Sequence, residues 1–333
     1  MNERITLANG AGGRQSSELI ETVFSSKFQN PHLTADDAAV LPPLDGNIAM
    51  TTDGFIVSPP FFAGGDIGKL SICGTVNDLS CMGARPMYMT AAFVIEEGFL
   101  VADLEKIASS MADTAKRAGV QLVAGDTKVA GKGQVDGLFI TTTGIGLIET
   151  SSNMSGSRAR VGDDVIVTGD IGRHGCAILL ERGDYKIDAS VTSDCAPLWD
   201  VVSAAMSAGE LHTVRDATRG GVGTVLYEIA SQSTVGIVLE RERIPLSPAV
   251  GGVCDLLGLE PLYLACEGTM VMIAPHECSE SIVRALSKVD QSRGATVIGR
   301  IEEHHAGKVM VNTEIGTRTF LPEPGNELLP RIC

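Results

Sequence analysis

The sequence predicts an α+β protein made of two α/β domains, and three observations carry that prediction. The chain has 333 residues, the length of two domains of ordinary size. Short β-branched segments alternate with amphipathic segments of helical period along most of it. A small polar stretch at 151–157 (SSNMSGS) separates two such series. We therefore expect the boundary between the two domains near residue 152.

Charge and cysteine usage narrow the functional class. The formal net charge is −15 and no basic run occurs, so neither a nucleic acid nor an anionic membrane is expected as a partner. No stretch of eighteen apolar residues exists, and residues 1–6 lack the core of a signal peptide. The eight cysteines form no CxxC pair, which predicts reduced core thiols rather than a zinc site. A cytoplasmic location is expected.

The first half begins with a glycine-rich segment. Residues 9–14 (NGAGGR) fit neither a dinucleotide fingerprint nor a P-loop, so a phosphate lid and a plain loop both remain open. Residues 64–70 resemble a P-loop but have the wrong spacing, and no Ser or Thr follows Lys69. The apolar periods predict helices at 16–28, 64–80 and 101–118, a strand start at 36–40, and strands at 48–54, 120–124 and 138–148.

Several aspartates stand at or near the ends of these elements, where α/β proteins place much of their chemistry. They are Asp36, Asp37, Asp53, Asp78 and Asp126. A carboxylate beside glycines or a buried strand is costly to bury without a partner. Carboxylate oxygens suit Mg²⁺, which bridges them to nucleotide phosphates. A metal–phosphate site is one interpretation, and solvated surface carboxylates are the other.

The second half continues the alternation of strands and helices. A strand is expected within 161–170, helices at 173–182 and 194–208, a helix that ends at Ser231, and strands after Glu267-Gly268 and at 309–311. Asp216 and a glycine cluster precede the helix that ends at Ser231, a pattern that favours a nearby anion or a plain tight turn.

The last residues, 319–333, are expected to form a mobile tail. Two prolines and a glycine at 321–327 exclude a helix or a central strand. About twelve extended residues could span roughly 40 Å, enough to move the thiol of Cys333 between two places. A frayed end that happens to finish in cysteine is the alternative.

Taken together, the motifs resemble the HypE family of hydrogenase maturation factors. These carbamoyl dehydratases belong to the superfamily of aminoimidazole ribonucleotide synthetase and selenophosphate synthetase. The matching stretches span the chain: 9–14, 36–40, 52–54, 77–86 (NDLSCMGARP), 125–129 (GDTKV), 215–221, 266–268 and 330–333 (PRIC). The segments at 77–86 and 125–129 are specific to the superfamily, and PRIC is specific to HypE.

The resemblance implies a fold and an assembly. Both α/β domains would be of the aminoimidazole ribonucleotide synthetase type, with the N-terminal sheets paired into a barrel across a homodimer. ATP would bind near that interface. The implied divisions are a glycine-rich lid and helix at 1–35, an ATP-binding and dimerisation domain at 36–152, a C-terminal α/β domain at 153–318, and a flexible tail at 319–333.

The resemblance also implies site residues. The Mg²⁺ ligands would be Asp37, Asp53, Asp78 and Asp216, although it leaves open which touch the metal directly and how many ions bind. The nucleotide contacts would be Asp53, Asp78, Gly125, Asp126 and Thr127, with Gly12 and Gly13 in the lid.

The implied reaction starts from a carbamoyl group held as a thiocarbamate on Cys333. ATP phosphorylates the amide oxygen, and loss of phosphate leaves a thiocyanate on the same sulfur, the source of the cyanide ligands of [NiFe]-hydrogenase. Phosphoryl transfer needs Mg²⁺ and positioning, and the elimination needs a general base. Lys128 and Glu267 are the candidate bases. The alternatives are phosphate neutralisation for Lys128 and a structural turn for Glu267.

The implied partners are the carbamoyltransferase HypF, which loads Cys333, and the HypC–HypD scaffold, which accepts the cyanide group. Four other hypotheses compete. Selenophosphate synthetase carries a Cys or selenocysteine and a Lys that segment 9–14 lacks, and aminoimidazole ribonucleotide synthetase needs no terminal cysteine. A nucleotide-binding carrier or scaffold, and a bare interaction module, remain as non-enzymatic alternatives.

Overall fold

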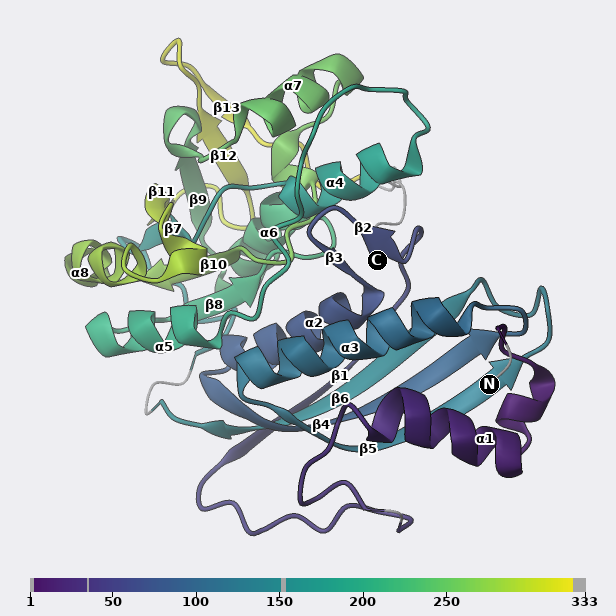
Figure 1. The fold of residues 1–333 in the computed structure, drawn as a ribbon. Helices are drawn as coiled ribbons and strands as arrows, with labels where there is room; N and C mark the ends of the chain where they lie inside the picture. The colour runs from purple at the N-terminus through teal and green to yellow at the C-terminus, as the bar shows by residue number, and fades with distance from the viewer. Residues whose placement is uncertain (1–2, 35, 151–153, 326–333) are drawn as a thin grey trace. The chain divides into compact units, whose positions relative to one another are not determined.

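The structure is a computed structural model that describes residues 3–34, 36–150 and 154–325 (Figure 1). It divides into two compact units. The N-terminal unit comprises Met1–Phe61, Gly65–Leu79 and Ala84–Ile148, and the C-terminal unit comprises Phe62–Gly64, Ser80–Gly83 and Glu149–Cys333. Within the described ranges, no helix is long and apolar enough to cross a membrane.

A four-stranded sheet forms the N-terminal unit, in the order β1-β6-β4-β5. The strands are β1 (Ile48–Phe55), β4 (Ala84–Glu96), β5 (Gln121–Ala130) and β6 (Leu138–Ile148). β4 pairs with β5 in parallel and with β6 antiparallel. A short ribbon of β2 (Phe61–Phe62) and β3 (Gly65–Asp66) precedes α2 (Ile67–Cys81). The order places β5 at an edge of the sheet.

Helices α2 and α3 (Val101–Ala118) lie along one face of this sheet (Figure 1). The apolar positions of α3 are buried as its period predicts, and the helix ends at Gly119, whose φ of +69° suits a left-handed C-cap. On β1, by contrast, Ile48 and Met50 remain 55% and 69% exposed. They pair in register with Leu147 and Ile145 of β6. The face of the sheet that carries these four side chains is therefore apolar and accessible.

The N-terminal segment runs alongside β5 (Figure 1). A 3-10 turn, η1 (Leu7–Gly10), leads into α1 (Arg14–Leu19), which continues as the π-helical η2 (Ile20–Ser25). A Cβ on Gly10 would lie 2.9 Å from the Cβ of Val129, so the turn packs closely on β5. Farther along, Asn30 Nδ2 donates to the carbonyl of Leu122 at 2.7 Å. The helix predicted at 16–28 is thus confirmed in outline.

Two predictions for this unit are wrong, and one strand was not predicted. Residues 36–38 form bends and no strand starts there. The strand predicted to end at 124 continues to Ala130, because β4 offers backbone partners as far as Glu96 and this pairing outweighs the turn tendency of Gly-Asp. The central strand β4 itself was not predicted, although its run MTAAFVI (89–95) is typical of a strand. By contrast, the predictions for β1, β6, α2 and α3 are confirmed.

A seven-stranded sheet organises the C-terminal unit, in the order β13-β12-β9-β11-β7-β10-β8. Its strands are β7 (Asp164–Val167), β8 (Thr213–Asp216), β9 (Gly236–Glu240), β10 (Met270–Ala274), β11 (Thr296–Glu302), β12 (Val309–Asn312) and β13 (Arg318–Phe320). The helices are α4 (Arg173–Arg182), α5 (Trp199–Ala208), α6 (Gly221–Ser233), α7 (Pro248–Leu257) and α8 (His276–Leu286), with 3-10 turns η3 (Arg241–Arg243), η4 (Pro261–Tyr263) and η5 (Asp290–Ser292).

Two cores lie on opposite faces of this sheet. Val271 and Ile273 of β10 join the core that includes α6, whereas Met270 and Met272 join the core of α5 and α8. Because β10 is covered on both faces, it is apolar at every position. A third cluster joins α4 to α7.

The predicted strands after Gly268 and at 309–311 are confirmed, and so is the helix at 173–182. The helix predicted at 194–208 begins only at Trp199, since Pro197 disfavours helical geometry in the residue before it.

The segment predicted as a tail starts within the sheet. β13 pairs with β12, and Leu321 is 2% exposed. The Tyr227 hydroxyl donates to the carbonyl of Leu321, and the Tyr263 hydroxyl donates to the carbonyl of Pro322. Residues through 322 are thus anchored, and Cys333 lies outside the described residues.

Candidate active site

A pocket of about 1010 Å³ in the N-terminal unit brings together several predicted residues. One part of its lining is aromatic: the rings of Phe24 and Phe93 lie 4.6 Å apart between centroids. The other part is polar and includes Asp37 and residues 125–127. A pocket of this size and composition suits a ligand with a flat apolar group and a charged end.

Gly125, Asp126 and Thr127 lie within β5. A Cβ on Gly125 would lie 2.9 Å from the carbonyl oxygen of Ala91, so close pairing of the parallel strands favours glycine there. Asp126 Oδ1 accepts from the Thr127 N–H at 2.8 Å and from Lys128 Nζ at 2.8 Å. The Lys128 ammonium holds the pKa of Asp126 below its usual range, with the Thr127 N–H adding to the effect. Lys128 thus presents a cation beside the polar end of the pocket.

Asp53 on β1 and Asp78 on α2 both lie near the contact between these two elements. Thr51 Oγ1 donates to Asp78 Oδ2 at 2.9 Å. Asp53 Oδ1 accepts from the Gly54 N–H at 2.8 Å, and its Oδ2 lies 3.8 Å from where a Cβ on Gly74 would stand. Gly74 lies one helical turn before Asp78, so the two carboxylates share this contact.

These carboxylates fit a hydrated Mg²⁺ ion. In the described ranges, no three His, Cys, Asp or Glu side chains gather into a group that could hold a metal. Magnesium, however, is commonly bound by one or two carboxylates, with water and substrate phosphates completing its shell. Asp53 and Asp78 supply such a pair, and Asp37 lies in the pocket lining instead.

Asp216 and Glu267 lie in the C-terminal unit on neighbouring segments. Asp216 ends β8 in register with Met270 of β10. The Cys266 N–H donates to the carbonyl of Ala217 at 2.9 Å, which ties the two segments together. Glu267 is only 4% exposed. A carboxylate this buried costs free energy unless it is paired. Glu267 therefore serves either the structure of this turn or the chemistry of the site.

Gly12 and Gly13 do not line the pocket. A Cβ on either would meet nothing within 4 Å, and only Gly12, with φ +79°, needs glycine for its backbone. The Gly12 N–H donates to Ser16 Oγ at 2.9 Å. The loop reaches β5 through Gly10, near residues 127–129, and its predicted role as a lid stays a prediction.

The chain is similar to known proteins along its length. The family model for the N-terminal domain of AIR synthase related proteins matches residues 35–148, and that for the C-terminal domain matches residues 160–312. Carbamoyl dehydratase HypE of Rhodobacter capsulatus is 44% identical over 337 aligned residues, covering 100% of this chain and 99% of the relative. The chain belongs to the HypE family.

Solved HypE structures agree with this assignment. One, a hydrogenase maturation protein HypE in complex with ATP, matches with a TM-score of 0.94 and 42% identity, over 98% of this chain and 99% of that one. Another, a HypE–HypF complex, matches with a TM-score of 0.82 and 45% identity, over 92% and 99%. The resemblance drawn from the motifs is confirmed, as is the two-domain fold of the AIR synthase type.

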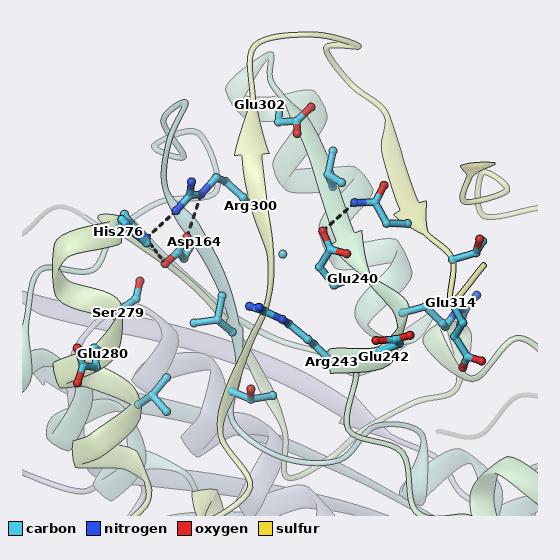
Figure 2. A pocket seen from close by; sticks show the side chains of 18 of the residues that line it. Asp164, Glu240, Glu242, Arg243, His276, Ser279, Glu280, Arg300, Glu302 and Glu314 are labelled. Carbon is cyan, nitrogen blue, oxygen red and sulfur yellow. Dashed lines mark hydrogen bonds and ion pairs between the residues drawn. The ribbon is translucent and has the colours of Figure 1, made fainter. Parts of the chain in front are cut away.

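A second pocket, of about 1120 Å³, lies in the C-terminal unit and contains none of the residues expected in a HypE site (Figure 2). Asp164 accepts from Arg300 Nε at 3.2 Å and lies 2.8 Å from His276 Nδ1. Glu240 accepts from Asn312 Nδ2 at 2.7 Å. Much of its charge is therefore already paired, and the pocket of the N-terminal unit fits the HypE motifs better.

The sequence did not predict two features of the pocket in the N-terminal unit: the aromatic pair in its lining and the hydrogen bonds of Asn30. Phe24 and Phe93 are adjacent only because η2 folds against β4, and Phe24 has the period of an ordinary core residue. Asn30 Oδ1 accepts from the N–H groups of His32 and Leu33, which builds the turn beside Leu122. The Asn-Pro sequence at 30–31 is the one local signal of that turn.

Proposed function

We propose that the chain is an ATP-dependent carbamoyl dehydratase. The thiocarbamate on Cys333, R–S–C(=O)–NH₂, reacts with ATP to give R–S–C≡N, ADP and phosphate. The product supplies cyanide ligands for the iron of [NiFe]-hydrogenase. The observation that carries this proposal is the 44% identity, over the full length, to a carbamoyl dehydratase. The pocket lined by Asp37 and residues 125–127 supports it.

In this proposal the pocket of the N-terminal unit binds the nucleotide. The aromatic part beside Phe24 and Phe93 receives the base, and Gly125, Asp126 and Thr127 face the phosphates. Asp53 and Asp78 would hold Mg²⁺, with Asp37 as a further ligand or a water-mediated contact. When bound, Mg²⁺ neutralises charge on the transferring phosphoryl group. The protein's part in that step is mainly positioning.

Glu267 serves as the general base of the elimination, and Lys128 neutralises phosphate. The Lys128 ammonium group donates to Asp126, which lines the pocket, and this places its charge where a phosphate could pair with it. Glu267 is 4% exposed, so little water competes for its carboxylate. Removing both protons from the carbamoyl nitrogen allows the C≡N bond to form as the C–O bond to the phosphorylated oxygen breaks.

The assembly is a homodimer in which the apolar face of β1 and β6 pairs with its copy. Exposure of Ile48 and Met50 at 55% and 69% supports that interface, since apolar patches on a sheet commonly mark protein contacts. A HypF relative forms a solved complex with a HypE, and we propose the same loading partner here. The HypC–HypD scaffold accepts the cyanide group.

The test is a Cys333→Ala variant mixed with the carbamoyltransferase, carbamoyl donor and Mg²⁺-ATP. We expect the variant to make no cyanide-bearing product, because the sulfur that would carry the carbamoyl group is gone, and to bind ATP with wild-type affinity, because a terminal residue supports little of a fold. If ATP hydrolysis continues at the wild-type rate and no chemistry occurs on the wild-type sulfur, the chain is a nucleotide-binding carrier instead.

A further inference from the structure

The Glu267-Gly268 turn is held by the carboxylate of a residue distant in sequence. The Glu267 N–H donates to Asp194 Oδ1 at 3.1 Å, and the Gly268 N–H donates to Asp194 Oδ2 at 2.9 Å. Both oxygens of one carboxylate thus bind consecutive backbone donors. Hydrogen bonds to an ionised acceptor are roughly twice as strong as neutral ones.

The backbones of these two segments also touch. The Ala196 N–H donates to the carbonyl of Glu267 at 3.2 Å, so both backbone groups of Glu267 are engaged from residues 194–196. A Cβ on Gly268 would lie 1.8 Å from the carbonyl oxygen of Asp194, a clash that only glycine avoids. The main chain at Glu267 therefore has little freedom.

The segment that carries Asp194 is itself fixed. Ser193 Oγ accepts from the Cys195 N–H at 3.1 Å and contacts His174 Nδ1 at 2.9 Å. Arg173 Nε donates to the carbonyl of Thr192 at 3.0 Å. The segment that carries Asp194 is thus bound to the start of α4, and the Asp194 carboxylate is bound to the Glu267 turn, a rigid support of the kind that a reactive side chain needs.

The surroundings make this carboxyl unusual. Burial raises the pKa of Asp194, and the N–H groups of Glu267 and Gly268 oppose that rise. A buried carboxylate is retained at such a position when its hydrogen bonds offset its desolvation. Cys266, next to the turn, has a pKa raised by burial, so its thiol stays protonated. Glu267 is then the side chain of this turn that can take a proton.

We infer that Asp194 is a positioning residue for the dehydration, fixing the backbone of Glu267 so that its carboxylate meets the carbamoyl nitrogen. This inference rests on the proposed function and on the role of Glu267 as base. A shift of about 1 Å in a reacting group lowers the rate by about 10²-fold. Asp194 touches neither ATP nor the carbamoyl group in this account.

The test is a double-mutant cycle in the full-length protein, loaded with its carbamoyltransferase, with the Asp194→Asn and Glu267→Gln variants. Asparagine keeps the size of Asp194 but sets an amide N–H against one of the two backbone donors. We expect kcat of Asp194→Asn to fall about 10²-fold, with KM for ATP unchanged. Adding Asp194→Asn to Glu267→Gln should lower kcat no further, because the two residues act as one unit.

Asp188→Asn is the matched control, because Asp188 is an exposed carboxylate six residues earlier in the same loop region. It should keep wild-type kcat. Each rate is divided by the concentration of ATP-binding sites, measured by titration, which corrects for any loss of folded protein. If Asp194→Asn does not fold, Asp194→Ser, which keeps one acceptor without added bulk, replaces it in the cycle.

The outcomes separate the two proposals. Equal multiplicative losses in the wild-type and Glu267→Gln backgrounds, or a wild-type rate for Asp194→Asn, would overturn the positioning role while the dehydratase function stands. A wild-type rate for Glu267→Gln would overturn it as well. No conversion by the wild-type protein would reject the proposed function, and the positioning role with it.

Discussion

The close packing of α2, which carries Asp78, on β1, which carries Asp53, depends on a glycine. Gly74 of α2 packs closely on the ring of Phe55: a Cβ there would lie 2.7 Å from a ring carbon. Glycine lets α2 approach β1 closely enough for Thr51 to donate to Asp78. A carboxylate pair at such a contact suits Mg²⁺ because hard oxygen donors can share one ion with phosphate.

We predict that Asp78→Asn weakens Mg²⁺-ATP binding by roughly 10–100-fold, since it removes one charged ligand from the pair. Calorimetric titration with ATP, with and without Mg²⁺, measures the effect. Asp113→Asn, an exposed change on α3, is the control and should bind as wild type. Equal affinity in Asp78→Asn and wild type would remove Asp78 from the metal ligands.

The cysteines give a second prediction at this scale. Burial raises the pKa of Cys176 to about 11 and that of Cys254 to about 12. A thiol reacts as its thiolate, which forms only as pH rises toward the pKa, so at pH 8 nearly all of each stays protonated and inert.

Iodoacetamide at pH 8 should therefore modify Cys333 long before Cys176, Cys254 or Cys266, as peptide mass mapping over time would show. Unfolding in guanidinium should make all of them react at similar rates. Faster modification of Cys254 than of Cys333 in the folded protein would contradict the proposed role of Cys333 as an accessible carrier.

At the scale of elements, the sequence predicted the bounds of the helices more accurately than those of the strands. The period of α3 predicted its bounds because one apolar stripe faces the sheet. The length of β5 could not be predicted, since residues 125–130 are strand only through pairing with β4. The same limit applies to the site: Asp194 reaches Glu267 across 73 residues, and nothing local marks that contact.

The loop after η2 depends on one side chain. Asn30 Nδ2 donates to Phe28 and Leu122 carbonyls, and its Oδ1 accepts from His32 and Leu33. We predict that Asn30→Ala lowers the free energy of unfolding by about 1–3 kcal/mol, because its partly buried partners lose their hydrogen bonds. It should also weaken ATP binding, since this loop lines the pocket.

Urea unfolding and ATP titration check both effects of Asn30→Ala. Gln15→Ala, another amide truncation in the N-terminal segment but at an exposed position, is the control and should change neither. An unchanged ATP affinity in a destabilised Asn30→Ala protein would show that the loop does not contribute to nucleotide binding.

At the scale of the whole molecule, the exposed apolar face of the N-terminal sheet predicts the assembly. Met50→Arg places a charge in the proposed homodimer interface and should convert dimers to monomers, because an unpaired charge is costly to bury. Leu256→Arg is a matched control: Leu256 is 68% exposed and Met50 69%, but Leu256 lies on α7 of the other unit.

Light scattering after size-exclusion chromatography measures the molar mass of each variant in solution. A dimeric Met50→Arg protein, or a monomeric wild-type protein, would contradict this interface. The full-length match to HypE places both domains in one family.

The central claim is that Cys333 carries a carbamoyl group that ATP dehydrates. The most direct measurement is the mass of the peptide ending at Cys333, taken after loading by the carbamoyltransferase and again after Mg²⁺-ATP is added. We predict that the carbamoylated peptide loses the mass of one water, and only when ATP is present. A carbamoyl group that persists with ATP, or a sulfur that is never modified, would contradict the claim.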